Sequence, residues 1–153
     1  MKKDADTTMD HFVIHADGGA RGNPGPAAIG YTIDGSDITP VQHGEYIGET
    51  TNNVAEYTAV IRALAKLKSL IGSGRAARAK VQVRADSELL VRQVNGEYKV
   101  KDETLAKLFI QLYNARQDFG EVSFSHVARE KNKEADKMVN EALDRHNVPK
   151  FGF

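Results

Sequence analysis

Three consecutive strand-like segments precede the first helical segment, and this order constrains the fold more than any other feature of the chain. The segments His11–Ala16, Ala27–Asp34 and Val41–Gly48 are rich in β-branched and aromatic residues, and turn-forming sequences separate them. Sequential strands joined by short turns pair antiparallel. We therefore expect the chain to begin its fold with an antiparallel sheet.

Helical and strand-like segments alternate through the rest of the chain. The strongest helical periodicity begins after Thr50-Thr51-Asn52-Asn53, which supplies N-cap chemistry, and ends at Gly72. A basic loop, GSGRAARAK, then leads to the strand VQVRAD, the helix SELLVRQV, a helix over Thr104–Asp118, the strand EVSFSHV and a helix over Lys133–Arg145. The expected apolar face of the helix over Thr104–Asp118 carries Leu105, Leu108, Phe109, Leu112 and Tyr113. Strands that alternate with helices form parallel units with right-handed crossovers.

The predicted fold class is therefore α/β. We expect a five-stranded mixed sheet, with three antiparallel strands followed by parallel βαβ units, and helices on both faces. A chain of 153 residues has the length of one domain. We assign the domain to residues 11–146, between a disordered N-terminal lead at residues 1–10 and a C-terminal tail at residues 147–153.

Composition limits the kind of site that the chain can build. The chain has no cysteine, so carboxylates and the five histidines are the candidate metal ligands. The formal net charge is zero, and any binding of nucleic acid must depend on local basic patches and on bound metal. The N-terminal segment has no apolar stretch of the kind that signal peptides carry. We expect a cytoplasmic protein without a membrane partner.

Four acidic residues lie at the ends of predicted elements. Asp17 closes the first strand, Asp86 closes the fourth, and Glu56 and Asp136 lie near the starts of the first and last helices. If the first and fourth strands are parallel neighbours, their carboxyl ends meet at one edge of the sheet. Converging carboxylates repel one another unless cations neutralise them. The pattern predicts a site for hard divalent ions such as Mg²⁺ or Mn²⁺, two of which can act together on a phosphodiester.

Each acid taken alone also has a structural interpretation. Asp17 before two glycines is a turn former, and Glu56 follows Asn53 at the spacing of a capping box. Asp86 is placed to cap the helix that follows it, and Asp136 is placed to interact with a helix dipole. The joint placement of the four at element ends favours the functional interpretation.

Four strings of the sequence resemble the ribonuclease H type 1 family in order and spacing: DGGARGNPGPAAIGY, TTNNVAEYTAVIRAL, RADSELLVRQVNGEY and HVAREKNKEADKMVNEAL. The resemblance extends from about His11 to Leu143 and implies the ribonuclease H-like fold. It also implies an endoribonuclease that hydrolyses the RNA strand of RNA/DNA hybrids with two Mg²⁺ or Mn²⁺ ions, leaving 3′-hydroxyl and 5′-phosphate ends. The family's catalytic and metal-binding acids fall on Asp17, Glu56, Asp86 and Asp136.

The resemblance further implies a role for each acid and a set of substrate contacts. Asp17 would bridge both ions, Asp136 would hold the ion that activates water, and Glu56 with Asp86 would hold the ion near the leaving 3′ oxygen. The implied substrate-binding residues are Gly18, Gly19, Asn23, Thr51, Asn52 and Asn53. Short amide side chains can contact 2′-hydroxyls across a wide minor groove, and glycine admits a sugar-phosphate backbone. For Asn52 and Asn53 the structural alternative is helix capping alone.

The chain departs from the commonest family pattern in three places. Glu49 stands just before Thr50, where many relatives carry a basic residue, and only GEYKVKDE occupies the place of a basic helical protrusion. The loop HVAREKNKEAD lacks an insertion that carries a histidine in many relatives. We interpret His126 as structural, with an accessory catalytic role as the alternative. Arg129 and the C-terminal tail KFGF are candidates to replace the loop histidine.

Positive charge for substrate binding has two candidate sources, which the sequence does not distinguish from ordinary solvated surface. They are the clusters Arg75, Arg78, Lys80, Arg84 and Arg129, Lys131, Lys133, Lys137.

Two other function classes also fit: a non-catalytic hybrid- or RNA-binding domain, and a nuclease for another substrate such as double-stranded RNA. The presence of all four acids favours catalysis. We expect a monomer without an obligate protein partner.

Overall fold

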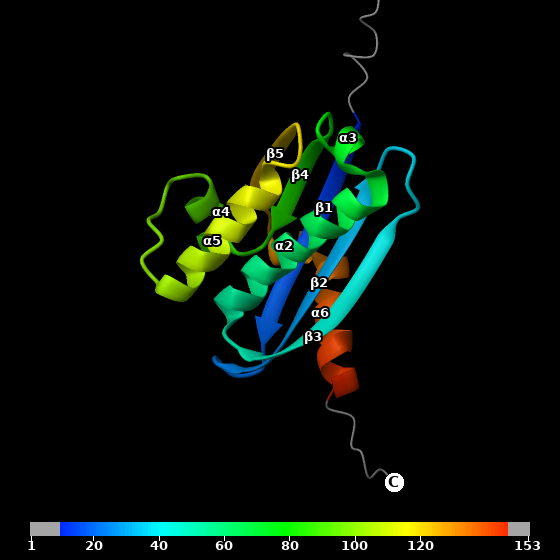
Figure 1. The fold of residues 1–153 in the computed structure, drawn as a ribbon. Coiled ribbons are helices and arrows are strands. Elements are labelled where there is room, and N and C mark those ends of the chain that lie inside the picture. The colour runs from blue at the N-terminus through cyan, green and yellow to red at the C-terminus, as the bar shows by residue number, and fades with distance from the viewer. Residues whose placement is uncertain (1–9, 147–153) are drawn as a thin grey trace, which may run out of the picture.

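A five-stranded sheet in the order β3-β2-β1-β4-β5 forms the centre of the computed structural model, which describes residues 10–146 (Figure 1). The strands are β1 (His11–Ala20), β2 (Gly25–Gly35), β3 (Val41–Thr50), β4 (Lys80–Ala85) and β5 (Glu121–His126). The helices are α2 (Asn52–Ile71), α3 (Ser73–Ala76), α4 (Glu88–Val94), α5 (Glu103–Arg116), the 3₁₀ turn η1 (Arg129–Lys131) and α6 (Lys133–His146). The predicted tail, and all of the predicted lead except Asp10, lie outside the described residues.

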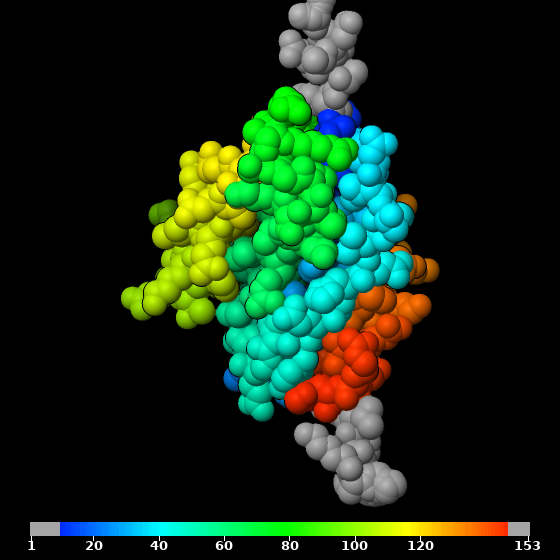
Figure 2. Space-filling model, turned by 45° about the vertical axis from the view of Figure 1, so that its right-hand side comes forward, coloured from blue at the N-terminus to red at the C-terminus, as the bar shows by residue number. Residues whose placement is uncertain are grey.

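The sheet has the predicted mixed topology. β2 pairs antiparallel with both β1 and β3, whereas β4 pairs parallel with both β1 and β5. Helix α2, with α5 beside it, covers one face of the sheet, and α6 crosses the other face (Figure 1). At its C-terminal end α6 reaches β3 (Figure 2), where the rings of Tyr46 and His146 stack with their centroids 3.6 Å apart. Within residues 10–146 no helix has the length and apolar character required to cross a membrane.

The alternation of side chains along β1 decides which residues face which helix. Phe12, Ile14 and Ala16 are buried in the main apolar core, together with residues of α2 such as Val60. Asp17 follows these residues and therefore projects from the opposite face, toward α6. Asp17 thus lies on the face of the sheet opposite the main core, directly after the last core residue of β1.

Strand β1 is longer than the sequence predicted. We expected Asp17 to close the strand and a glycine-rich turn to follow it, but β1 continues to Ala20 and pairs Asp17 with Gly30 of β2. The reason is the close approach of α2: a Cβ atom on Gly18 would clash with the backbone of Ala55. The glycine therefore serves helix packing within a strand, and the turn begins later.

Two other predictions differ from the structure. The segment that we predicted to be a basic loop contains the short helix α3. Tyr113, which we placed on the apolar face of α5, is 52% exposed, because the buried stripe of that helix is formed by Leu105 and Leu112. Neither difference changes the topology of the sheet.

Helix α6 lies close to the sheet because glycines form the surface beneath it. Gly30 of β2 pairs with Gly44 of β3, and a Cβ atom on Gly30 would clash with the backbone of Ala135. A Cβ atom on Gly44 would clash in the same way with the backbone of Met138. Since Gly30 is also the partner of Asp17, this close packing sets the distance between α6 and the first candidate acid.

We expect Gly30→Ala to lower the free energy of unfolding by roughly 1–3 kcal/mol, because the added methyl group forces α6 away from the sheet. Gly74→Ala is the matched control, since a Cβ atom on Gly74 of α3 would meet no atom within 4 Å. The control should be neutral or slightly stabilising. Urea denaturation monitored by circular dichroism measures both changes, and equal stabilities of the two variants would contradict the packing argument.

Candidate active site

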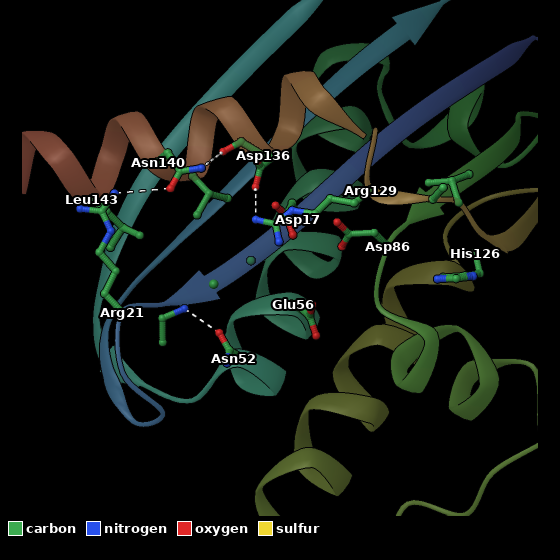
Figure 3. A pocket seen from close by; sticks show the side chains of 16 residues that line it. Asp17, Arg21, Asn52, Glu56, Asp86, His126, Arg129, Asp136, Asn140 and Leu143 are labelled. Carbon is green, nitrogen blue, oxygen red and sulfur yellow. Dashed lines mark hydrogen bonds and ion pairs between the residues drawn. The ribbon is translucent and has the colours of Figure 1, made fainter. Parts of the chain in front are cut away.

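Three of the four predicted acids converge where β1 and β4 separate. The parallel pairing of these strands ends with Ala16 beside Ala85, and Asp17 and Asp86 are the residues that follow. Glu56 reaches the same point from the first turns of α2 (Figure 3). One carboxylate oxygen from each acid lies within 4.8 Å of the others. The expectation that parallel strands bring Asp17 and Asp86 together is confirmed.

Helix α2 presents Glu56 to the site because the helix begins two residues earlier than a capping box between Asn53 and Glu56 would require. Thr51 is the N-cap, and its hydroxyl oxygen accepts a hydrogen bond of 3.2 Å from the backbone N–H of Val54. The capping-box alternative for Glu56 is therefore wrong, since the third helical position is Val54. The same holds for Asp86, because Ser87 and not Asp86 caps α4.

Asp136 joins the site from α6, on the other side of Asp17. The side chains of Asp17 and Asp136 share a hydrogen bond, and Arg129 donates to the Oδ1 atom of Asp136 at 3.3 Å (Figure 3). The guanidinium of Arg129 is otherwise largely in solvent, since its side chain is 76% exposed. The fourth acid is thus connected to the other three through Asp17.

Burial and mutual repulsion raise the pKa values of two of these acids. Burial raises the pKa of Asp17 to about 8, and the charges of Asp86, Asp136 and Glu56 add to the effect, as does the hydrogen bond with Asp136. Burial likewise raises the pKa of Glu56 to about 7, although a hydrogen bond from the Ser87 hydroxyl lowers it in part. The metal-free site therefore holds protons that a divalent cation would displace.

These oxygens suit a hard divalent cation. Mg²⁺ binds oxygen ligands at about 2.0–2.1 Å, so that oxygens on opposite sides of one ion lie about 4.2 Å apart. The separations in the acid cluster are of that order. All the candidate ligands are carboxylates, which hard cations prefer. We infer that the cluster is a metal-binding site.

We expect Asp17→Asn to stabilise the metal-free protein, because the substitution keeps the shape of the side chain and removes a buried charge. In EDTA at about pH 9, the unfolding temperature should rise by at least about 3 °C. At about pH 5 the difference should shrink, because the wild-type carboxyl is then already protonated in the folded state. Thermal denaturation monitored by circular dichroism measures both values.

The direction of this pH dependence follows from the number of protons that the folded and unfolded states bind. Folded Asp17 keeps its proton up to about pH 8, whereas an unfolded aspartate loses it near its ordinary pKa of about 3.9. The folded state binds more protons between these values, so the stability of the metal-free wild type falls as the pH rises through this window. Added Mg²⁺ should restore stability to the wild type only. A destabilised Asp17→Asn variant in EDTA at high pH would contradict the argument.

Asn132 connects the strand that carries Asp17 to the helix that carries Asp136, and the sequence did not single it out. Its side chain is buried, and its Nδ2 atom donates a hydrogen bond of 2.9 Å to the carbonyl oxygen of Ala16. Its own carbonyl oxygen accepts from the backbone N–H of Asp136 at 3.1 Å. Among the described residues its Oδ1 atom has no hydrogen-bond partner. Asn132 therefore sets the spacing between the two acids.

We expect Asn132→Asp to weaken metal binding as well as folding, because the isosteric carboxylate cannot donate to Ala16 when it is charged. Asn95→Asp is the matched control, since the Asn95 amide also donates to a strand carbonyl, that of Phe124, away from the acids. Both variants should lose about 1–3 kcal/mol of stability. Only Asn132→Asp should raise the Mg²⁺ concentration for half-maximal thermal stabilisation, and an unchanged value would contradict the positioning role.

The predicted substrate-binding residues divide between two adjoining pockets. Gly18, Gly19 and Asn52 line a pocket of about 480 Å³ together with the four acids. Asn23, Thr51 and Asn53 line a second pocket of about 380 Å³ at the start of α2. The second pocket also contains Asp102 and Thr104, which the sequence did not single out.

The polar side chains of these pockets use their acceptor atoms in holding the loops. Asn52 accepts from the backbone N–H of Ala20 at 2.8 Å, and Asn23 accepts from the backbone N–H of Asn52 at 3.0 Å. Thr51 accepts in the same way as the N-cap. These bonds leave the amide and hydroxyl donors of the same side chains available to oxygen-rich ligands.

His126 and Arg129 both line the pocket of the acids. His126 is the last residue of β5 and its side chain is exposed, which disagrees with the interpretation of a structural histidine. Arg129 is also exposed but bonds to Asp136. Arg129 is the accessory candidate that contacts a carboxylate of the site.

Comparison with known proteins agrees with this fold and site. Residues 15–142 match the family described as reverse transcriptase-like. The ribonuclease HI of Halobacterium salinarum is 36% identical over 134 residues, which cover 86% of this chain and 64% of that protein. The bifunctional protein Rv2228c of Mycobacterium tuberculosis is 40% identical over 134 residues, which cover 86% of this chain but 35% of that protein. The chain thus spans less than two thirds of either relative.

Solved structures give the same assignment over nearly the full length of each matched chain. LC11-RNase H1, isolated from compost and crystallised with an RNA/DNA hybrid, is 46% identical with a TM-score of 0.83, covering 90% of this chain and 99% of that one. RNase H1 of Halobacterium salinarum is 34% identical with a TM-score of 0.79, covering 88% and 98%. The fold and the acid cluster define a ribonuclease H-like domain. The chain belongs to the ribonuclease H1 family.

Proposed function

We propose that this chain is an endoribonuclease that hydrolyses the RNA strand of RNA/DNA hybrids and leaves 3′-hydroxyl and 5′-phosphate ends. The observation that carries the proposal is the convergence of acids from four separate elements: Asp17 from β1, Glu56 from α2, Asp86 after β4 and Asp136 from α6. Structural roles would explain single acids, but not a shared pocket in which the pKa of Asp17 is raised to about 8.

The four acids would hold two Mg²⁺ or Mn²⁺ ions, with Asp17 between them. In this assignment Asp136 serves the ion on the side of the attacking water, and Glu56 with Asp86 serves the ion on the side of the leaving 3′ oxygen. Such a pair of ions supplies an activated water and stabilises the charge that develops on the leaving oxygen. Ser87 supports the second group, because its hydroxyl donates to Glu56 while it caps α4.

Recognition of the hybrid would use the side-chain amide and hydroxyl donors of the two pockets. Gly18 and Gly19 let the RNA backbone approach the acids closely, and the Asn52 amide donates to the RNA strand. Asn23 and Thr51 would donate to a phosphate of the DNA strand in the second pocket, with Asn53 beside them. Asp102 also lines this pocket, and its negative charge would repel a phosphate. We therefore expect the phosphate contact there to be weak.

Arg129 is our candidate for the role that a loop histidine has in many relatives. Its guanidinium already contacts Asp136, and it is exposed enough to reach a phosphate. Displacement of Arg129 from Asp136 by an incoming ion would free its donors for the substrate or the product. His126, which also lines the pocket, would serve as an accessory group only.

We expect the chain to cut a labelled RNA/DNA hybrid when Mg²⁺ or Mn²⁺ is present and not in EDTA. Asp17→Asn and Asp136→Asn should each lower kcat by at least about 100-fold, because each removes a proposed metal ligand. Asp118→Asn is the matched control, since Asp118 pairs with Lys68 on the surface. New RNA 5′ ends should accept a kinase label only after phosphatase treatment.

Competition with duplex RNA and duplex DNA separates the proposal from its alternatives. A preferred cut in duplex RNA would assign the chain to another nuclease class. Tight hybrid binding that Asp17→Asn leaves unchanged, without turnover by the wild type, would indicate a binding domain. Equal turnover by the Asp17→Asn and Asp118→Asn variants would refute the acid assignment.

A further inference from the structure

Arg21 lies in the same pocket as the four acids, and the sequence did not single it out. The pocket continues from Asp17 along α6 to Asn140 and Leu143, and Arg21 forms part of its wall there. Figure 3 shows Arg21 and Asn140 on one side of the acids and His126 on the other. The pocket therefore has a cationic group at the end remote from β5.

The glycine-rich loop holds the backbone of Arg21, while α6 holds its side chain. The backbone N–H of Arg21 donates to the carbonyl oxygen of Pro26 at 2.8 Å. The guanidinium donates to the Oδ1 atom of Asn140 at 3.4 Å and pairs with Asp144 at 2.8 Å. The Asn140 amide in turn donates to the carbonyl oxygen of Asp136 at 3.1 Å. Arg21 is thus positioned relative to a proposed metal ligand.

The guanidinium remains available to a ligand. Its side chain is 40% exposed and that of Asp144 is 68% exposed, and exposed ion pairs of this kind are weak. Within the described residues, the guanidinium of Arg21 bonds to Asn140 and Asp144 through one terminal nitrogen, Nη2, and a guanidinium has five N–H donors in a planar fork. A phosphate can therefore bind to the remaining donors or replace Asp144.

We propose that Arg21 is a specificity-determining residue that binds a phosphate of the cleaved strand, beyond the scissile phosphate and on the side of Asn140. This inference rests on the proposed function, in which metal ions held by the acids would bind the scissile phosphate. A strand that passes the acids must continue along the same pocket, where Arg21 is the cation that it meets. Because the net charge of the chain is zero, such local cations supply the attraction for the phosphate backbone.

A purely structural role is the competing interpretation, in which Arg21 fastens the loop between β1 and β2 to α6. The two interpretations predict opposite effects for Asp144→Asn. If Arg21 binds phosphate, loss of the competing carboxylate strengthens hybrid binding. If Arg21 only fastens the loop, Asp144→Asn and Arg21→Gln remove the same ion pair and change binding in the same direction.

Equilibrium binding of the full chain to a short RNA/DNA hybrid in EDTA tests the proposal without cleavage. We expect Arg21→Gln to weaken binding about five- to tenfold and to reduce the slope of log affinity against log salt by about 0.9. Asp144→Asn should strengthen binding about two- to threefold at low salt. Arg145→Gln is the matched control, because Arg145 lies on α6 outside this pocket and should leave the slope unchanged.

Neutral methylphosphonate linkages placed singly in the hybrid identify the strand. A methylphosphonate at one position of the RNA strand should weaken hybrid binding by the wild type. The same linkage should not weaken binding by the Arg21→Gln variant any further. An Arg21→Gln slope equal to that of the wild type, or such a position in the DNA strand only, would overturn the proposal. If the wild type binds the hybrid but does not cut it with Mg²⁺, the proposed function fails while the Arg21 contact stands. If the wild type neither binds the hybrid in EDTA nor cuts it with Mg²⁺, both fail.

Discussion

The mutual repulsion of carboxylates in one pocket is the constraint on which the rest of the structure depends. Asp17 lies at the centre, buried beside Asp86 and hydrogen-bonded to Asp136, with Glu56 below. Bringing these groups together costs folding free energy, which burial of the core must offset. The resulting cluster is suited to metal ions, because a bound cation would relieve the repulsion that the fold imposes.

Close backbone packing makes this arrangement possible. Gly18 lets the first turns of α2 touch β1, and Gly30 with Gly44 lets α6 lie low across β2 and β3. The two helices approach from opposite faces of the sheet, and each contributes one acid at the edge where β4 turns away. Side chains at these glycine positions would move the acids apart before they affected the topology, so the glycines control the geometry of the site more than the fold itself.

The formal net charge of this chain is zero, and the two arginines beside the acids are paired with carboxylates. Arg129 contacts Asp136, and Arg21 lies further along α6 against Asn140 and Asp144. Both arginines pair with acidic groups of α6, which keeps the net charge low while leaving donors for phosphates. A nuclease built in this way would depend on bound metal and a few contacts for affinity, in place of a basic protrusion.

Much of the architecture followed from local patterns in the sequence. The strand and helix periodicities predicted the mixed sheet and the order of the elements along the chain, because side-chain alternation and helical spacing are local properties. The placement of Asp17 and Asp86 also followed, since parallel strands end at a common edge. The extension of β1 to Ala20 did not follow, because the glycines after Asp17 resemble a turn until the contact with α2 is known.

The sequence by itself determined the fold class and predicted the four acids and a metal site among them, because each of these depends on residue type and on spacing along the chain. Only the tertiary structure decided that Thr51 caps α2, that Asn132 links Ala16 to Asp136, and that Arg21 shares the pocket of the acids. These contacts join residues far apart in sequence or depend on which of several polar side chains takes a given hydrogen bond. Packing in three dimensions makes that choice, and local patterns do not contain it.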